Sequence, residues 1–213
     1  MITTHMKEET VQLIPGPVGK LELAFSAPVE KENKAWAIVC HPHSMYGGTM
    51  YNKVVTTLVK TFLGLGIGTV RFNFRGVGGS EGQYDQGNGE LDDLLAVINW
   101  VQQERQFREL WLAGFSFGSF VAAKAAAQIP ISKLITIAPP VEHFPMQSLP
   151  PIECPWILAQ GERDEVVPPE KVFAWAEHRK PKPFILRFPE ADHFFHGQLN
   201  ELRTRLEEAL TVT

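Results

Sequence analysis

One short segment, residues 114–118, constrains the fold more than any other part of this chain. Its sequence is Gly-Phe-Ser-Phe-Gly, and it lies between an apolar run at 109–113 and an alanine-rich stretch at 119–128. The apolar run predicts a strand, and the alanine-rich stretch predicts a helix. In that context G-x-S-x-G predicts a nucleophile elbow, a sharp strand-to-helix turn that presents the hydroxyl of Ser116.

Short apolar runs recur along the chain with helical patterns between them. The predicted strands are residues 36–40, 68–74, 109–113, 134–138, 156–160 and 184–188, and the predicted helices are 52–65, 91–103, 119–128, 169–177 and 197–210. This alternation is typical of an α/β fold, a mostly parallel sheet with helices on both faces. Residues 11–25 predict a hairpin around the turn-forming segment 15–19, and its alternating pattern suits an antiparallel edge.

Length and composition indicate one α/β domain over residues 1–213. A chain of 213 residues with 44% hydrophobic and 21% charged residues is large enough to bury a full core. The proline-rich segment 139–155 is the longest irregular stretch. It can form at most a small lid, so no separate cap domain is expected.

Charge and cysteine content exclude several classes. The net charge of −4 argues against a nucleic-acid partner, which requires a basic face. Apolar runs are too short to cross a membrane. The two cysteines do not make a disulfide framework, and residues 1–10 are too polar for a signal peptide. A cytoplasmic location is therefore expected.

A serine hydroxyl attacks efficiently only when a base removes its proton and a third group orients that base. Asp164 is the predicted acid because it lies on the loop after the strand 156–160. Glu162 and Glu165 flank it and stay possible substitutes. His193 is the predicted base because it follows the strand 184–188.

His196 is the rival base, three residues further on. Stabilising the oxyanion requires two backbone N–H groups. Phe117, directly after the serine, is expected to supply one. The loop after residues 36–40 supplies the other, from His43 or else Ser44, since the intervening proline has no N–H.

Several motifs together resemble the α/β-hydrolase superfamily, in particular its small lidless esterase-like branch, related to dienelactone hydrolases and acyl-peptidases. They are His41-Pro42-His43 with Gly47-Gly48, the segment 71–78, residues 114–118, and Asp192-His193-Phe194-Phe195-His196-Gly197. The similarity runs from about residue 34 to the end of the chain. It implies Ser116 as nucleophile, Asp164 as acid and His193 as base. Many relatives have His-Gly where this chain has His41-Pro42.

The expected reaction is hydrolysis of a carboxylic ester or related small-molecule acyl compound, without a metal or other cofactor. Apolar residues near the site predict a small hydrophobic acyl group in a shallow, open site: Met45, Tyr46, Phe115, Phe117, Phe194 and Phe195. Thioester, peptide and acyl-transfer chemistry use the same machinery. A hydrolase-like scaffold that only binds a ligand or partner is the alternative from another class.

Two further patterns have a weaker claim to chemistry. The glycines of residues 76–82 do not match a dinucleotide fingerprint, because no helix follows and a glutamate stands at the last glycine position. A tight structural loop is expected there. The histidines of residues 41–43 and 193–196 could supply metal ligands, but the H-E-x-x-H arrangement of many zinc enzymes is missing.

Overall fold

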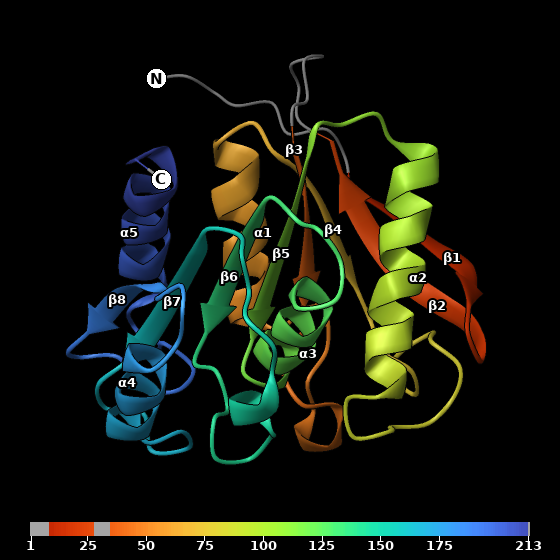
Figure 1. Cartoon of the computed structure of the whole chain (residues 1–213). Coiled ribbons are helices and arrows are strands. Elements are labelled where there is room, and N and C mark those ends of the chain that lie inside the picture. The colour runs from red at the N-terminus through yellow and green to blue at the C-terminus, as the bar shows by residue number, and fades with distance from the viewer. Residues whose placement is uncertain (1–8, 28–34, 213) are drawn as a thin grey trace.

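The computed structural model describes residues 9–27 and 35–212 and centres on one eight-stranded sheet with the strand order β1-β2-β4-β3-β5-β6-β7-β8 (Figure 1). The strands are β1 (Thr10–Gly16), β2 (Gly19–Ser26), β3 (Ala35–Cys40), β4 (Gly68–Phe72), β5 (Glu109–Phe115), β6 (Lys133–Ile137), β7 (Trp156–Gly161) and β8 (Phe184–Phe188). The helices are α1 (Lys53–Gly64), α2 (Gly89–Glu104), α3 (Phe117–Ala126), α4 (Pro169–Glu177) and α5 (Leu199–Val212), with short 3-10 helices at Ser44–Tyr46 (η1) and Met146–Ser148 (η2).

The sheet is parallel except at one edge. β1 pairs antiparallel with β2, and β2 pairs antiparallel with β4. Every other neighbouring pair is parallel. The strands β3, β4, β6 and β7 are buried along their whole length, because helices cover both faces of a parallel sheet and leave no wet side. The predicted fold class and the antiparallel edge hairpin are confirmed.

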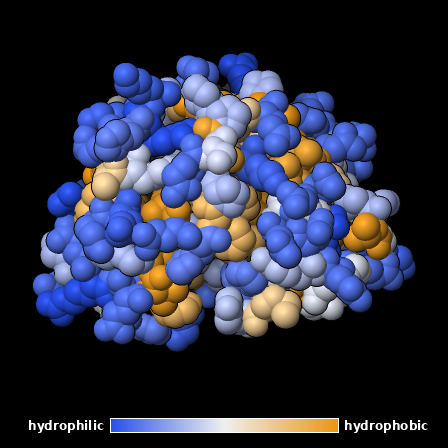
Figure 2. Space-filling view, turned by 60° about the horizontal axis from the view of Figure 1, so that its bottom comes forward, coloured by the Kyte–Doolittle hydropathy of each residue, from blue (hydrophilic) through white to orange (hydrophobic). Residues whose placement is uncertain are grey.

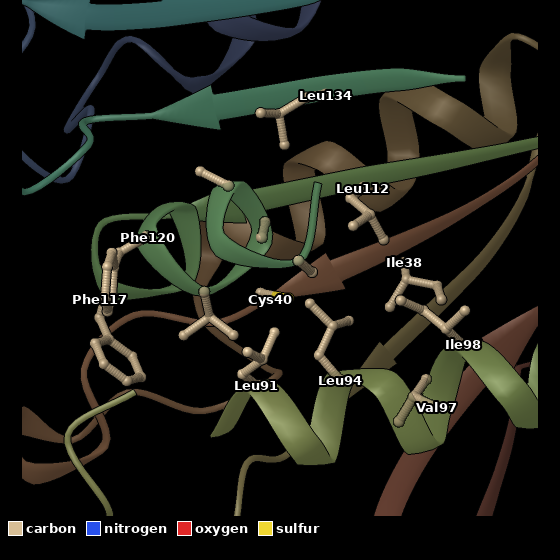
Figure 3. Packing of buried hydrophobic residues seen from close by; sticks show 14 of the residues in the cluster. Ile38, Cys40, Leu91, Leu94, Val97, Ile98, Leu112, Phe117, Phe120 and Leu134 are labelled. Carbon is tan, nitrogen blue, oxygen red and sulfur yellow. The ribbon is translucent and has the colours of Figure 1, made fainter. Parts of the chain in front are cut away.

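Two hydrophobic cores lie on opposite faces of the sheet. Helices α2, α3 and α4 cover one face and α1 and α5 cover the other (Figure 1). On the first face, Leu94 and Val97 of α2 point toward Ile38 of β3 and Leu112 of β5 (Figure 3). Helices α1 and α2 form because their apolar residues recur at helical spacing and present a continuous buried stripe, whereas α3 is buried on nearly every side because it packs between the sheet and α2.

Strand β5 extends two residues further than the apolar run predicts. It ends at Phe115 and α3 begins at Phe117, so Ser116 alone separates them. Gly114 is part of β5 and Gly118 is part of α3. Propensities would not predict this, because glycine is disfavoured inside strands and helices. The strand-to-helix turn is therefore as tight as a single residue allows.

The glycine-rich segment 75–82 is fastened to its surroundings by side chains. The buried Arg75 donates to Asp93 of α2 at 2.8 Å. Ser80 Oγ donates to the carbonyl of Asn73 at 2.6 Å, and Glu22 accepts the Gly79 N–H at 2.8 Å. Arg75, Ser80 and the Gly79 N–H are thus bonded to neighbouring parts of the protein, as expected for a structural loop. In the described ranges, no helix has both the length and the apolarity needed to span a membrane.

Candidate active site

Ser116 lies in a strained backbone conformation at the carboxyl end of β5. Its φ of 52° and ψ of −120° fall in a region that residues with a side chain rarely adopt. The turn depends on its two glycines. A Cβ on Gly114 would lie 2.2 Å from the Gly118 carbonyl oxygen, and one on Gly118 would lie 2.3 Å from that of Cys40. The Ser116 N–H donates to Ile137 of β6 at 2.8 Å, which holds the turn against the sheet.

Three side chains from three strand ends form a hydrogen-bonded series. Ser116 Oγ lies 3.2 Å from His193 Nε2, and His193 Nδ1 lies 2.8 Å from Asp164 Oδ2. A carboxylate can only accept, so Nδ1 carries the proton and Nε2 is free to accept from the serine hydroxyl. His193 and Asp164 are both buried, at 5% exposure each, so water does not compete for the bond between them, whereas the bond to Ser116 is only partly buried.

Asp164 is held by three donors besides the histidine. Its Oδ1 accepts the N–H groups of Val166 at 2.9 Å and Val167 at 2.7 Å. Its Oδ2 accepts from the side chain of Gln160 at 3.1 Å. These bonds fix the carboxylate on the loop after β7. The flanking carboxylates lie elsewhere: Glu165 is exposed and Glu162 faces Arg187 at 3.7 Å.

The second histidine on the loop after β8 does not join this series. His196 Nδ1 lies 2.7 Å from Asp192, and both side chains are largely exposed. The rings of Phe115 and Phe194 pack on the imidazole of His193, with centroids 5.1 and 5.0 Å away. Phe194 is half-exposed, whereas Phe115 is fully buried.

The loop after β3 passes close to the turn at Ser116. A Cβ on Gly118 would also lie 2.6 Å from the His41 carbonyl oxygen. In the part of the chain that the structure describes, neither His43 nor Ser44 uses its backbone N–H in a hydrogen bond. The Phe117 N–H belongs to the first turn of α3, where intrahelical acceptors are lacking. All three candidate oxyanion donors therefore keep a free N–H.

A cavity of about 1030 Å³ opens beside Ser116. It is lined by residues of the loop after β3, the segment before α2, one face of α3 and the segments after β6 and β7: His43, Tyr46, Tyr84, Gln86, Asn88, Ser116, Phe117, Phe120, Lys124, Gln128, Pro140, His143, Phe144, Pro145, Ser148, Leu149, Pro150, Val166 and Val167. Figure 2, with the carboxyl ends of the strands turned forward, shows apolar surface in the middle of this face among hydrophilic groups.

Only some of the apolar residues predicted to contact the substrate line the cavity. Tyr46 and Phe117 line the cavity, whereas Met45, Phe115 and Phe194 do not. Phe115 faces the core between the sheet and helices α1 and α5, and Phe117 faces the opposite core. Placing Phe115 on the substrate surface was therefore wrong, because the residues on either side of the turn leave on opposite faces of the sheet.

Most residues of the cavity wall were not predicted from the sequence. Tyr84, Phe120 and Phe144 supply rings, and the irregular segment 139–155 forms one side through η2. A signal existed in α3, where Phe117, Phe120 and Lys124 follow helical spacing from Ser116 onward and so share one face of the helix. The contribution of the segment 139–155 depends on tertiary packing, with Met146 and Ile152 buried as its anchors.

Burial favours the neutral form of the two histidines on the loop after β3. Burial lowers the pKa of His41 to about 4, against the opposing effect of its hydrogen bond to the Pro42 carbonyl. Partial burial likewise lowers the pKa of His43. Within residues 9–27 and 35–212, no cluster of three or more His, Cys, Asp or Glu side chains could hold a metal ion.

Comparison with known proteins agrees with this geometry. The family model of the alpha/beta hydrolase fold matches residues 39–153. An uncharacterised protein of Rickettsia prowazekii is 32% identical over 205 residues, which cover 92% of this chain and 86% of that protein.

Solved structures extend the similarity over almost the entire chain. A serine hydrolase homologue from Coxiella burnetii is 46% identical, with a TM-score of 0.91 over 99% of both chains. A serine hydrolase without a lid from Xanthomonas campestris is 43% identical, with a TM-score of 0.90 over 96% of this chain and 94% of that one. The resemblance seen in the motifs is confirmed: this chain belongs to the α/β-hydrolase fold family, in its lidless esterase-like branch.

Proposed function

We propose that this protein is a serine hydrolase that cleaves a carboxylic ester or related small-molecule acyl compound through an acyl-enzyme on Ser116. Membership of the family supports a hydrolase, and one observation carries the finer proposal. Ser116, His193 and Asp164 form a hydrogen-bonded series at a strained turn that presents a hydroxyl beside a cavity. A scaffold that only binds a ligand has no need of this alignment.

The proton movements follow from the hydrogen bonds. As Ser116 Oγ attacks the carbonyl carbon, its proton passes to His193 Nε2, 3.2 Å away. Asp164 fixes the tautomer with the proton on Nδ1 and stabilises the imidazolium that forms. The imidazolium then protonates the leaving alcohol. Water, deprotonated by the same nitrogen, attacks the acyl-enzyme and releases the acid.

The negative charge on the carbonyl oxygen requires donors that are already in place. The N–H of Phe117 is one donor in this proposal, and the N–H of His43, or alternatively of Ser44, is the other. Among the described residues none of these three N–H groups has another acceptor, and His43 lines the cavity. Preorganised donors of this kind contribute on the order of 10²–10³ in rate each.

The substrate in this proposal is apolar in the part next to the scissile bond. The rings of His43, Phe117 and Phe144 all line the cavity and pack against one another, with His43–Phe117 and Phe117–Phe144 centroids 5.0 and 5.1 Å apart. Tyr46, which also lines the cavity, adds exposed aromatic surface, whereas the exposed side chains of Met45 and Phe194 lie outside the cavity lining. No step requires a metal or an organic cofactor.

Substitution of the nucleophile tests the proposal. Ser116→Ala removes only the hydroxyl, so the elbow and the fold remain, and hydrolysis of a 4-nitrophenyl ester should fall by on the order of 10⁶. A fluorophosphonate probe should label the wild-type protein at Ser116 and leave the variant unlabelled. Hydrolysis by Ser116→Ala at the wild-type rate would refute the assignment.

A further inference from the structure

The ring of His43 has a defined tautomer. Its Nδ1 lies 3.2 Å from the backbone nitrogen of Met45, which can only donate. Nδ1 is therefore the acceptor and carries no proton, since a protonated Nδ1 would face another N–H. The proton of the neutral ring must lie on Nε2. The lowering of the His43 pKa by burial agrees with a neutral ring.

The tautomer of His43 determines what Tyr84 can do. His43 Nε2 lies 3.0 Å from the hydroxyl of Tyr84, and because Nε2 carries the proton, the phenolic oxygen accepts. The hydroxyl hydrogen of Tyr84 is then left for a different acceptor. Across the described ranges, Tyr84 makes no second hydrogen bond, although its side chain lines the cavity beside Ser116.

Tyr84 is held firmly in this position. The next residue, Asp85, gives its N–H to the buried Glu90 at 2.9 Å and accepts the Gly89 N–H at 3.0 Å. The Tyr84 ring also packs on His43 and Phe117, with centroids 4.8 and 5.8 Å away. Burial raises the pKa of the phenol, so the hydroxyl keeps its proton at neutral pH.

We propose that Tyr84 donates a hydrogen bond to an acceptor oxygen of the substrate within the aromatic cavity. The preferred substrates are then apolar esters that carry a second oxygen, such as a ketone or ether, rather than hydrocarbon esters of equal length. The inference rests on the proposed ester hydrolysis and adds a specificity-determining residue to it. An N–H that donates to the phenolic oxygen polarises the O–H and makes it a better donor.

The test compares 4-nitrophenyl hexanoate with its 4-oxo and 5-oxo analogues. For each enzyme, kcat/KM for an oxo ester is divided by kcat/KM for hexanoate. In the wild type, the ratio for at least one oxo ester should exceed that of Tyr84→Phe by about threefold to tenfold, the worth of one neutral hydrogen bond. The intrinsic reactivity of each ester cancels when the ratios of the two enzymes are compared. Tyr84→Phe also removes the hydroxyl that contacts His43, and any effect of this loss that is equal for both esters cancels as well.

Tyr51→Phe is the matched control, because Tyr51 stacks with Arg71 and does not line the cavity. It should keep the wild-type ratios. Equal ratios in the wild type and Tyr84→Phe would overturn the assignment of Tyr84 while leaving the hydrolase intact. A folded wild-type protein that neither hydrolyses these esters nor reacts with a fluorophosphonate would instead overturn the proposed function, and this inference with it.

Discussion

Three histidines near Ser116 differ in what their ring nitrogens contact. His193 faces a serine and a carboxylate, and His43 faces a backbone N–H and a phenol. His41 is bonded only to backbone, with Nδ1 donating to the Pro42 carbonyl at 2.6 Å and Nε2 accepting the Phe74 N–H at 3.0 Å. It therefore fastens the predicted oxyanion loop to the end of β4 and has no nitrogen left for a substrate or metal.

Protonation of His41 should weaken the fold in mild acid. Its pKa is about 4 in the folded protein against 6.5 when unperturbed. The unfolded chain thus binds the proton more readily between these values, and stability falls as pH drops through that window. The free energy of unfolding measured with urea should fall by about 2 kcal/mol between pH 7 and pH 5 because of this residue.

The contribution of His41 is isolated by comparing variants. His41→Asn should be less stable than the wild type at pH 7 and lose less free energy on acidification, whereas the exposed His178→Asn should follow the wild-type pH dependence. A pH dependence in His41→Asn as steep as that of the wild type would show that other groups dominate acid sensitivity.

Among the secondary-structure elements, β5 and α3 carry the most demanding junction. The backbone atoms of β3 and α3 approach so closely that Gly118 has no room for a side chain, and they cannot retreat without breaking the sheet. Gly118→Ala should therefore cost at least about 3 kcal/mol of unfolding stability. Chemical denaturation monitored by circular dichroism measures this loss.

Gly64, at the end of α1, is the control for that substitution. A Cβ there would meet only flexible side chains, the nearest atom being Arg203 Nη2 at 3.2 Å. Gly64→Ala should leave stability unchanged or raise it by up to about 1 kcal/mol, since alanine favours the helix. A Gly118→Ala protein as stable as Gly64→Ala would contradict the close approach of the two backbones.

The sequence predicts the junction between β5 and α3 because this turn depends on residues close together in the chain. Apolar runs and helical spacing predict most elements, and the order of Ser116, Asp164 and His193 along the chain places each at a strand end. Their hydrogen bonds agree with that expectation, and their catalytic roles stay predictions. The cavity wall was less predictable, because Tyr84 and Phe144 lie on irregular segments whose positions depend on distant packing.

The fold as a whole separates the site from much of the core. Strand order reverses direction at β3, which lies between β4 and β5. Ligands of such sheets bind beyond the carboxyl ends at a reversal of this kind, and Cys40 and Gly114 are paired there. Helices α1 and α5 pack together on the face of the sheet opposite to α3 and its cavity.

This separation predicts that stability and activity can be changed independently on the α5 side. Leu206 is fully buried in the core between α5, α1 and the sheet. Leu206→Ala should lower the free energy of unfolding by about 2–5 kcal/mol through the cavity it leaves. Thr204→Ala, exposed on the same helix, should change it by less than about 0.5 kcal/mol.

Activity should not follow stability in these variants. Fluorophosphonate labelling counts the active sites and so gives the rate per folded molecule. Below the unfolding temperature of Leu206→Ala, this rate should stay within about twofold of the wild-type rate. The reason is that substitutions at distant sites usually act independently of one another. In the described part of the chain, the imidazole of His193 is hydrogen-bonded to Asp164 and Ser116, and neither of these residues lies on α5. Phe115, whose ring packs on the imidazole, shares the core with Leu206 and is a route by which this substitution could reach the site. A loss of rate per labelled molecule that matched the loss of stability would mean that α5 and the site move as one unit.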